Sequence, residues 1–330
     1  MKIAYIDLGI NNPPEDYSIY PCRYGGGSCF ARYAKEELNK RGIHFRIYGP
    51  ARVFDSLDEE DNDGACITVE DFKLDFIKQG VPAQLLIPEL TNYDIVLHHH
   101  DCLYINTSQI KAKSVHWSLS GKADGGHPLN DCDLLYNHEE APCFQGQKIL
   151  PVQIGKYIPP YQKHDKKDFV FACSRHDTFM NTIEVAKNCL EYGIQGFFGG
   201  PIFHDYPLLN YIDGKTTHYL GVMHEEDKLL YTRTARLYPL LCDWDVVFNQ
   251  SALEANGEGT PLLVTPRGWF NGYVKEGVNG FFYNGKNFLD CYKRANLVDP
   301  KACNMMASKY NVKNMIDSFL KAFTIILSWG

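Results

Sequence analysis

One stretch of the sequence places a carboxylate in a helix that follows a loop, in a pattern that suits ligand binding. Residues 236–241 form an apolar run long enough for a buried strand, and residues 243–250 form a loop. Ser251 is then placed to cap a helix that carries Glu254. The loop between such a strand and helix lies at the carboxyl end of a parallel sheet, where open α/β sheets bind their ligands. The same pattern also fits an ordinary strand–helix–strand unit with Glu254 on the helix surface.

A glycine-rich segment stands between an apolar strand at residues 2–8 and an amphipathic helix. It consists of Gly25, Gly26, Gly27 and Ser28. The backbone N–H groups of such a segment and of the helix that it opens suit a phosphate, although a plain turn is the alternative. The spacing is not the dinucleotide fingerprint G-x-G-x-x-G, which argues against a nicotinamide-dependent dehydrogenase.

Histidines gather at the ends of two predicted strands. His98, His99 and His100 follow the apolar residues 93–97, and His116 lies near the end of the next strand. Neighbouring residues on a strand point to opposite faces, so three consecutive histidines cannot easily bind one ion. The pattern therefore favours loop histidines over a metal site, and we predict no metal. A core histidine is the alternative for His116.

The elements that must position these side chains are apolar strands that alternate with amphipathic helices, which predicts an α/β protein. A chain of 330 residues is long for one core and fits two domains. Residues 155–167 contain two consecutive prolines and several lysines and are typical of a linker. The last predicted helix, residues 312–327, has one apolar face.

Composition excludes several classes of protein. A net charge of −7 and a pI near 5.9 provide no global basic field for nucleic acid or an anionic membrane. No apolar run reaches the length of a membrane span, and the N-terminus lacks the pattern of a signal peptide. The 11 cysteines are scattered without a Cys-x-x-Cys pair, which argues against a zinc site or a redox couple. Together these features predict a cytoplasmic protein with free thiols.

The spacing from Trp244 to Glu254 resembles the segment W-D-E-P-F-G-x-x-x-x-E-A-x-A-x-G-T-P of GT4-type retaining glycosyltransferases. The residues in register are Trp244, Asp245, Phe248, Glu254, Ala255, Gly259, Thr260 and Pro261. Residues 221–231 and 276–281 resemble two further segments of that family, G-x-v-x-x-e-e-l-x-x-l-y and e-x-G-x-N-G-f. The resemblance implies the GT-B fold, in which two Rossmann-like domains face each other across a cleft and the C-terminal helix crosses back to the first domain.

The resemblance also implies a role for each domain. Residues 1–158 and 310–330 would form the acceptor-side domain, and residues 159–309 the domain that binds a nucleotide-sugar. Glu254 would accept hydrogen bonds from the ribose, because a carboxylate has enough lone pairs for two vicinal hydroxyls. Arg175 would hold the donor diphosphate, since a guanidinium suits phosphate oxygens.

Further site residues follow from the same resemblance. The catalytic candidates are His116, Asp245 and Arg175. The donor-binding candidates are Gly26, Gly27, Ser28, Ser174, Arg175, Asn249, Gln250, Ser251 and Glu254. The candidates for contact with the sugar or the acceptor are His98, His99 and His100. Two positions depart from the family, because Val246 replaces its first glutamate and Met180-Asn181 stand where a phosphate-binding lysine is expected.

The resemblance implies a retaining hexosyltransferase that moves a hexose-like sugar from a UDP- or GDP-sugar to an acceptor hydroxyl. The acceptor would be a glycan, a lipid-linked molecule or a small molecule, and no metal or other cofactor would be obligatory. The two departures favour one alternative, a nucleotide-sugar-binding protein of the same fold with impaired turnover. A second alternative is a phage-type transferase that acts on modified DNA bases, against which the acidic net charge weighs.

Overall fold

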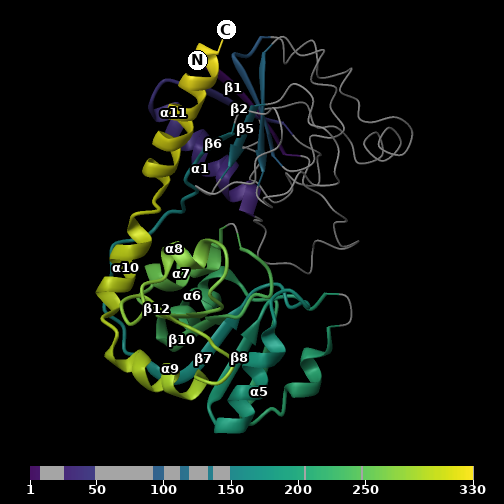
Figure 1. Cartoon of the computed structure of the whole chain (residues 1–330), viewed down its shortest axis with the longest axis vertical. Helices are drawn as coiled ribbons and strands as arrows, with labels where there is room; N and C mark the ends of the chain where they lie inside the picture. Colours follow the sequence, from purple (N-terminus) through teal and green to yellow (C-terminus); the bar gives the residue numbers. More distant parts are fainter. Residues whose placement is uncertain are drawn as a thin grey trace, which may run out of the picture. The chain divides into compact units, whose positions relative to one another are not determined.

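The computed structural model describes residues 1–7, 26–48, 92–99, 112–118, 133–136, 149–203, 206–246 and 248–329. The chain divides into two compact units (Figure 1). The first unit contains the described residues up to Tyr157 and again from Val312, and the second runs from Ile158 to Asn311. The boundaries expected from the sequence are 158/159 and 309/310. Which unit takes the donor and which the acceptor stays a prediction.

The first unit is built on a six-stranded parallel sheet with the order β2-β1-β3-β4-β5-β6. Its strands are β1 (Lys2–Asp7), β2 (His44–Tyr48), β3 (Ile95–His99), β4 (Lys113–Ser118), β5 (Asp133–Tyr136) and β6 (Ile149–Pro151). Residues 3–5 and 95–97 are completely buried, side chains of both faces included. Such continuous apolar runs are typical of parallel strands that are covered on both faces.

Two helices of the first unit pack against each other, α1 (Gly26–Lys40) and α11 (Val312–Ser328) (Figure 1). Arg41, which follows α1, forms an ion pair with Asp317 of α11. Nζ of Lys113 donates a hydrogen bond to the carbonyl oxygen of Trp329 at 2.6 Å. The buried face of α11 consists of Met315, Ile316, Phe319, Ala322, Phe323 and Ile326. The C-terminal helix therefore belongs to the first unit, as the GT-B resemblance implies.

The second unit is built on another six-stranded parallel sheet, with the order β12-β11-β10-β7-β8-β9. Its strands are β7 (Lys167–Cys173), β8 (Gln195–Gly199), β9 (Thr217–Gly221), β10 (Ala235–Leu240), β11 (Leu262–Val264) and β12 (Gly280–Phe282). The chain begins with β7 in the middle, adds β8 and β9 on one side, and then adds the other three strands on the opposite side. This is the doubly wound order, and its topological switch point lies between β7 and β10.

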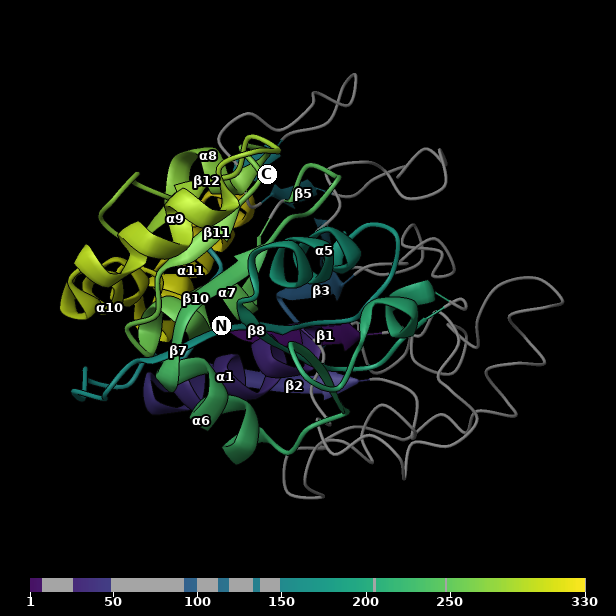
Figure 2. The ribbon, with the colours of Figure 1, turned by 90° about the horizontal axis from the view of Figure 1, so that it is seen from below.

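Helices cover both faces of this second sheet. They are α5 (Thr182–Tyr192), α6 (Glu225–Thr234), α7 (Gln250–Gly257), α8 (Trp269–Tyr273), α9 (Phe288–Arg294) and α10 (Pro300–Ser308), with short 3-10 helices η6 (Pro207–Tyr211) and η7 (Ala295–Leu297). Val170 and Ala172 of β7 pack in the core that contains α5, and Phe169 and Phe171 pack in the core that contains α7. This alternation is the period of two of a β-strand. Figure 2 accordingly shows α5 and α6 on opposite sides of β7 and β8.

Two predicted helix starts are wrong in detail. We expect a helix from about residue 178, but α5 begins at Thr182. The carboxylate of Asp177 accepts hydrogen bonds from the N–H groups of Phe179 and Met180, at 3.0 and 3.1 Å, and holds these residues in a turn instead.

The second error concerns the cap of α7. Asn249, not Ser251, is the capping residue, because its Oδ1 accepts a hydrogen bond from the N–H of Ala252 at 2.9 Å. The helix therefore begins at Gln250, and Ser251 lies within its first turn.

The strand expected at residues 93–97 also lies further along the chain. β3 runs from Ile95 to His99, because β1 pairs with it as far as Asp7, which stands opposite His99. His98 and His99 are therefore the last two residues of a strand rather than loop histidines.

Candidate functional site

Two loops flank the switch point of the second sheet. Residues 174–181 follow β7, and residues 241–249 follow β10. The N–H of Asp243 donates to the carbonyl oxygen of Phe179 at 2.9 Å and so joins the two loops. Loops at the carboxyl ends of the strands beside the switch point form the usual ligand site of a doubly wound sheet. The candidate site of the second unit is therefore at this edge.

Glu254 lies in α7, directly after the second of these loops. Its Oε2 is 3.1 Å from Nζ of Lys228 on α6, and only 11% of the Glu254 side chain is exposed. This burial and pairing do not fit a glutamate on an open helix surface. The lysine lies against one carboxylate oxygen, and a carboxylate accepts hydrogen bonds with both of its oxygens.

Arg175 lies in the first loop, and its guanidinium is fixed from one side. Its Nε is 2.5 Å from Oδ2 of Asp177, and its Cζ lies 5.7 Å from the centre of the Phe203 ring. Only 6% of the Asp177 side chain is exposed, against 55% of the Arg175 side chain. Asp177 therefore orients a guanidinium that remains accessible to an anionic ligand. The sequence analysis does not identify Asp177, which belongs to the loop but is part of no recognised motif.

The same loop contains a buried neutral histidine. His176 has no exposed surface, and its Nδ1 is 3.1 Å from the hydroxyl of Thr182. Its backbone N–H donates to the carbonyl oxygen of Pro201 at 2.8 Å. Burial lowers the pKa of His176 to about 4, so the ring is neutral at neutral pH. The side chain supports the loop that carries Arg175, a role that the sequence analysis misses.

The first turn of α7 presents two further candidates, Gln250 and Ser251. The Ser251 side chain lies near the hydroxyl of Tyr238 on β10, and complete burial raises the pKa of Tyr238 well above its usual value. The start of α7 thus lies beside the strand before it. In the other loop, the N–H of Ser174 donates to the carbonyl oxygen of Gly199 at 3.1 Å, which attaches that loop to β8.

The two departures from the family pattern are packed into the unit. Sγ of Cys242 lies 3.9 Å from Sδ of Met180, which packs against the core that contains α7. Val246 is buried, and its carbonyl oxygen accepts a hydrogen bond from the N–H of Trp269 at 2.6 Å. Neither residue offers a charge to the loops. Asp245, next to Val246, is exposed.

The histidine candidates of the first unit lie on neighbouring strands. His98 of β3 stands in register opposite His116 of β4. His99 stands opposite Asp7 of β1 on one side and Trp117 of β4 on the other. The sheet thus brings the backbones of three of the four candidate histidines to the carboxyl ends of adjacent strands. The fourth, His100, lies outside the described residues.

Gly26, Gly27 and Ser28 form the first turn of α1, so the glycine-rich segment opens a helix as predicted. The N-terminus of such a helix offers backbone N–H groups to an anion. Gly25 lies outside the described residues. Within the described part of the chain, no group of three or more His, Cys, Asp or Glu side chains is arranged to hold a metal ion. No helix among the described residues is long and apolar enough to cross a membrane.

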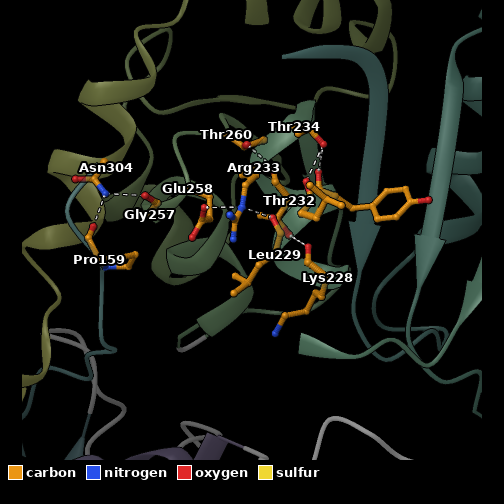
Figure 3. Close-up of polar contacts among 12 residues, drawn as sticks. Pro159, Lys228, Leu229, Thr232, Arg233, Thr234, Gly257, Glu258, Thr260 and Asn304 are labelled. Atoms are coloured by element: carbon orange, nitrogen blue, oxygen red, sulfur yellow. Dashed lines mark hydrogen bonds and ion pairs between the residues drawn. The ribbon is translucent and has the colours of Figure 1, made fainter. Parts of the chain in front are cut away.

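Figure 3 shows polar contacts around α6 and the end of α7, including the ion pair between Arg233 and Glu258. Nε of Arg233, in the last turn of α6, is 3.3 Å from Oε2 of Glu258, the residue that ends α7. Lys228, near the start of α6, points away from this pair in the figure. Two ion pairs therefore connect the helices about one turn apart, because Lys228 instead pairs with Glu254 in the middle of α7.

Comparison with solved structures identifies the fold. No model of a protein family and no curated protein matches the chain. The structure of AviGT4, a glycosyltransferase involved in avilamycin A biosynthesis, matches with a TM-score of 0.72 and 14% identity over 100% of this chain and 98% of that one. HepE of Anabaena in complex with UDP-glucose matches with a TM-score of 0.71 and 13% identity, over 98% and 100% of the two chains.

A third similar structure is the lipopolysaccharide outer core galactosyltransferase WaaB in its apo form. It has a TM-score of 0.67 and 16% identity, over 98% of this chain and 99% of that one. The likeness extends over whole chains and includes both Rossmann-like units. The chain therefore has the GT-B fold.

Proposed function

We propose that this protein is a retaining glycosyltransferase that moves a hexose-like sugar from a UDP- or GDP-sugar to an acceptor hydroxyl. The observation that carries the proposal is the arrangement at the switch point of the second sheet. Glu254, a partly buried carboxylate, lies in the helix on the β10 side of that point. Arg175, an accessible guanidinium, lies in the loop after β7 on the other side. A nucleotide-sugar requires both chemistries, an acceptor for ribose hydroxyls and a cation for the diphosphate.

The structural neighbours support the choice of donor. HepE of Anabaena was solved with UDP and with UDP-glucose, and both complexes resemble this chain over nearly its full length. We therefore assign Glu254 to the ribose and Arg175 to the diphosphate. Asn249 uses its Oδ1 to cap α7, so a contact between Asn249 and the donor would come from its Nδ2. The remaining donor contacts are assigned to Ser174, Gln250 and Ser251.

Further proposed site residues belong to the first unit. Gly26, Gly27 and Ser28 would offer backbone N–H groups near the phosphates, since they form the first turn of a helix. His116 and Asp245 are the proposed contacts to the transferred sugar. His98, His99 and His100 are proposed to contact the sugar or the acceptor, and the mechanism assigns no role to a metal ion.

A second candidate function is nucleotide-sugar binding with little or no turnover. Its basis is the absence of charge at Met180 and Val246, both of which pack in the protein. A transferase stabilises the departing diphosphate with positive charge, and Arg175 already shares part of its charge with Asp177. Binding and turnover therefore have to be measured separately.

The decisive experiment combines a thermal-shift screen with an activity assay. UDP, GDP, ADP and their glucose conjugates are added to the full chain, because a ligand that binds the folded state raises the melting temperature. We expect a UDP- or GDP-ligand to raise the melting temperature. We expect Glu254→Gln to reduce the affinity for that ligand by about 10- to 100-fold. Glu258→Gln is the matched control, because Glu258 follows Glu254 by one turn at the end of α7 and pairs with Arg233 instead of Lys228.

Release of sugar from the bound donor is then followed with and without candidate acceptors, and the anomer of the product is determined by NMR. Transfer with retention supports the transferase. Binding without hydrolysis or transfer for every donor and acceptor supports the second candidate. If no nucleotide or nucleotide-sugar shifts the melting temperature, both candidate functions are wrong.

A further inference from the structure

Lys228 occupies an unusual position for a helix lysine. It lies in the first half of α6 with only 14% of its side chain exposed, and it contacts two carboxylates at once. Its Nζ is 2.6 Å from Oε2 of Glu225, one turn earlier in α6, and 3.1 Å from Oε2 of Glu254 on α7. Glu225 has 54% of its side chain exposed, whereas Glu254 has 11%. The ammonium group thus connects an open carboxylate to a buried one.

The burial of Glu254 makes this lysine chemically important. A carboxylate that loses most of its hydration favours the protonated form unless a cation or hydrogen-bond donors compensate. A protonated carboxyl group has a donor O–H and fewer acceptor sites than the ionised form, so it receives two hydroxyl hydrogens less well. Lys228 is a cation in contact with Oε2, and this contact restricts the rotamer of the Glu254 side chain.

Simple attachment of α6 to α7 does not require this lysine. The pair Arg233–Glu258 connects the same two helices about one turn further along each of them (Figure 3). Helices that follow parallel strands begin at the carboxyl edge of the sheet, so Lys228–Glu254 is the pair at the ligand edge. The two pairs therefore have similar chemistry and different positions relative to the candidate site.

We propose that Lys228 is a positioning residue that holds the Glu254 carboxylate in its orientation, and thereby sets the preference of the site for ribonucleotides over 2′-deoxyribonucleotides. This inference rests on the proposed function, because it requires Glu254 to face the ribose. The two vicinal hydroxyls of a ribose can donate to both acceptor positions of an oriented carboxylate. A 2′-deoxyribose has only one of these two hydroxyls. The preference for ribose therefore depends on the geometry that Lys228 maintains.

The test measures the dissociation constants of UDP and 2′-deoxy-UDP by calorimetry, with GDP and 2′-deoxy-GDP in parallel. The wild-type protein is expected to prefer the ribonucleotide by about tenfold or more. Lys228→Met is expected to reduce the affinity for the ribonucleotide and to leave the affinity for the deoxyribonucleotide nearly unchanged. The ratio of the two affinities should then approach one. Arg233→Met, the matched control, is expected to keep the wild-type ratio whatever its effect on stability.

Two further variants separate positioning from folding. Lys228→Arg retains the charge and is expected to restore part of the ratio, and Lys228→Gln replaces Lys228→Met if the latter fails to fold. In the double variant Lys228→Met/Glu254→Gln, the ratio should fall no further than in Glu254→Gln alone, because both changes remove one interaction.

The outcomes distinguish the inference from the function that it assumes. If the wild-type protein prefers the ribonucleotide and Lys228→Met retains that preference, the role of Lys228 is refuted while the proposed function stands. An equal loss of affinity for both nucleotides would indicate a structural effect and would also refute it. If the wild-type protein binds none of the four nucleotides, both the proposed function and this inference are wrong.

Discussion

The hydroxyl of Tyr238 on β10 donates a hydrogen bond to the carbonyl oxygen of Cys173, the last residue of β7, at 2.6 Å. The N–H of Cys173 lies 3.3 Å from the same hydroxyl. One buried side chain thus bridges the two strands between which the sheet changes direction. It does so at the start of the loop that carries Arg175, and it also contacts Ser251 of α7. The bridge therefore connects the three elements of the candidate donor site.

Tyr238→Phe removes this bridge without changing the shape of the core. The carbonyl of Cys173 loses a buried partner, so we expect a loss of about 1–3 kcal/mol in the free energy of unfolding. We also expect weaker binding of UDP or GDP, because the loop after β7 loses its attachment to β10. The control is Tyr273→Phe, which removes a buried hydrogen bond to Asn256 at 2.8 Å. Urea unfolding should show similar losses for both variants, and calorimetry should show weaker nucleotide binding for Tyr238→Phe alone.

Arg175→Met should weaken nucleoside diphosphate binding by about 10- to 100-fold, because it removes a charged donor to the phosphates. Arg175→Lys should lie between this variant and the wild type, since an ammonium group lacks the planar fork of a guanidinium. The binding of the nucleoside alone should not change. Arg294→Met removes the same charge from an exposed ion pair with Glu276 and is the control for net charge. Equal effects of Arg175→Met on nucleoside and diphosphate would contradict the assignment.

Gly200→Ala tests the close approach between β8 and the loop after β7. The backbone of Gly200 has φ = 113°, and a Cβ at this position would collide with the carbonyl oxygen of Ser174. We expect a loss of about 1–3 kcal/mol in unfolding free energy, and weaker diphosphate binding as the loop moves. Gly214→Ala is the control, because Gly214 has φ = 70° but open space around it. A Gly200→Ala variant as stable as Gly214→Ala would show that the loop adapts without strain.

His176 predicts an acid-sensitive stability. Its pKa is lowered to about 4 in the folded protein from an ordinary value of 6.5, mainly by burial. Between these values the unfolded chain binds more protons, so stability is lost as the pH falls from 6.5 toward 4, by on the order of 3 kcal/mol. His176→Asn should reduce the slope of the urea midpoint against pH in this window. His224→Asn, at an exposed histidine that precedes α6, should follow the wild-type curve. If His176→Asn has the same slope as the wild-type protein, another group is responsible for the acid sensitivity.

Local pattern predicted elements of both units. The strand expected at residues 236–241 and the helix expected at residues 312–327 correspond to β10 and α11, because apolar runs and apolar faces depend on neighbouring residues alone. The start of α5 was predicted too early, because no periodicity reveals that Asp177 will cap a turn. The cap of α7 was misplaced for a similar reason, since Asn249 and Ser251 are both good capping residues and only geometry chooses between them.

For the candidate site too, the sequence alone identified the motif residues but not the residues that support them. The spacing of the motif residues singled out Glu254 and Arg175, because a family pattern is a property of the sequence. It did not reveal Asp177 beside Arg175 or Tyr238 between the two loops. These residues belong to no motif, and their roles appear only when β7 and β10 lie next to each other.

By itself, the sequence determined the α/β class, the division into two Rossmann-like units, and the motif residues proposed to bind a nucleotide-sugar. Hydrophobic periodicity and motif spacing are encoded along the chain, so these features can be read without coordinates. Only the tertiary structure decided which charges meet. Lys228 and Glu254 lie on different helices, and their contact depends on how α6 and α7 pack over the same face of the sheet.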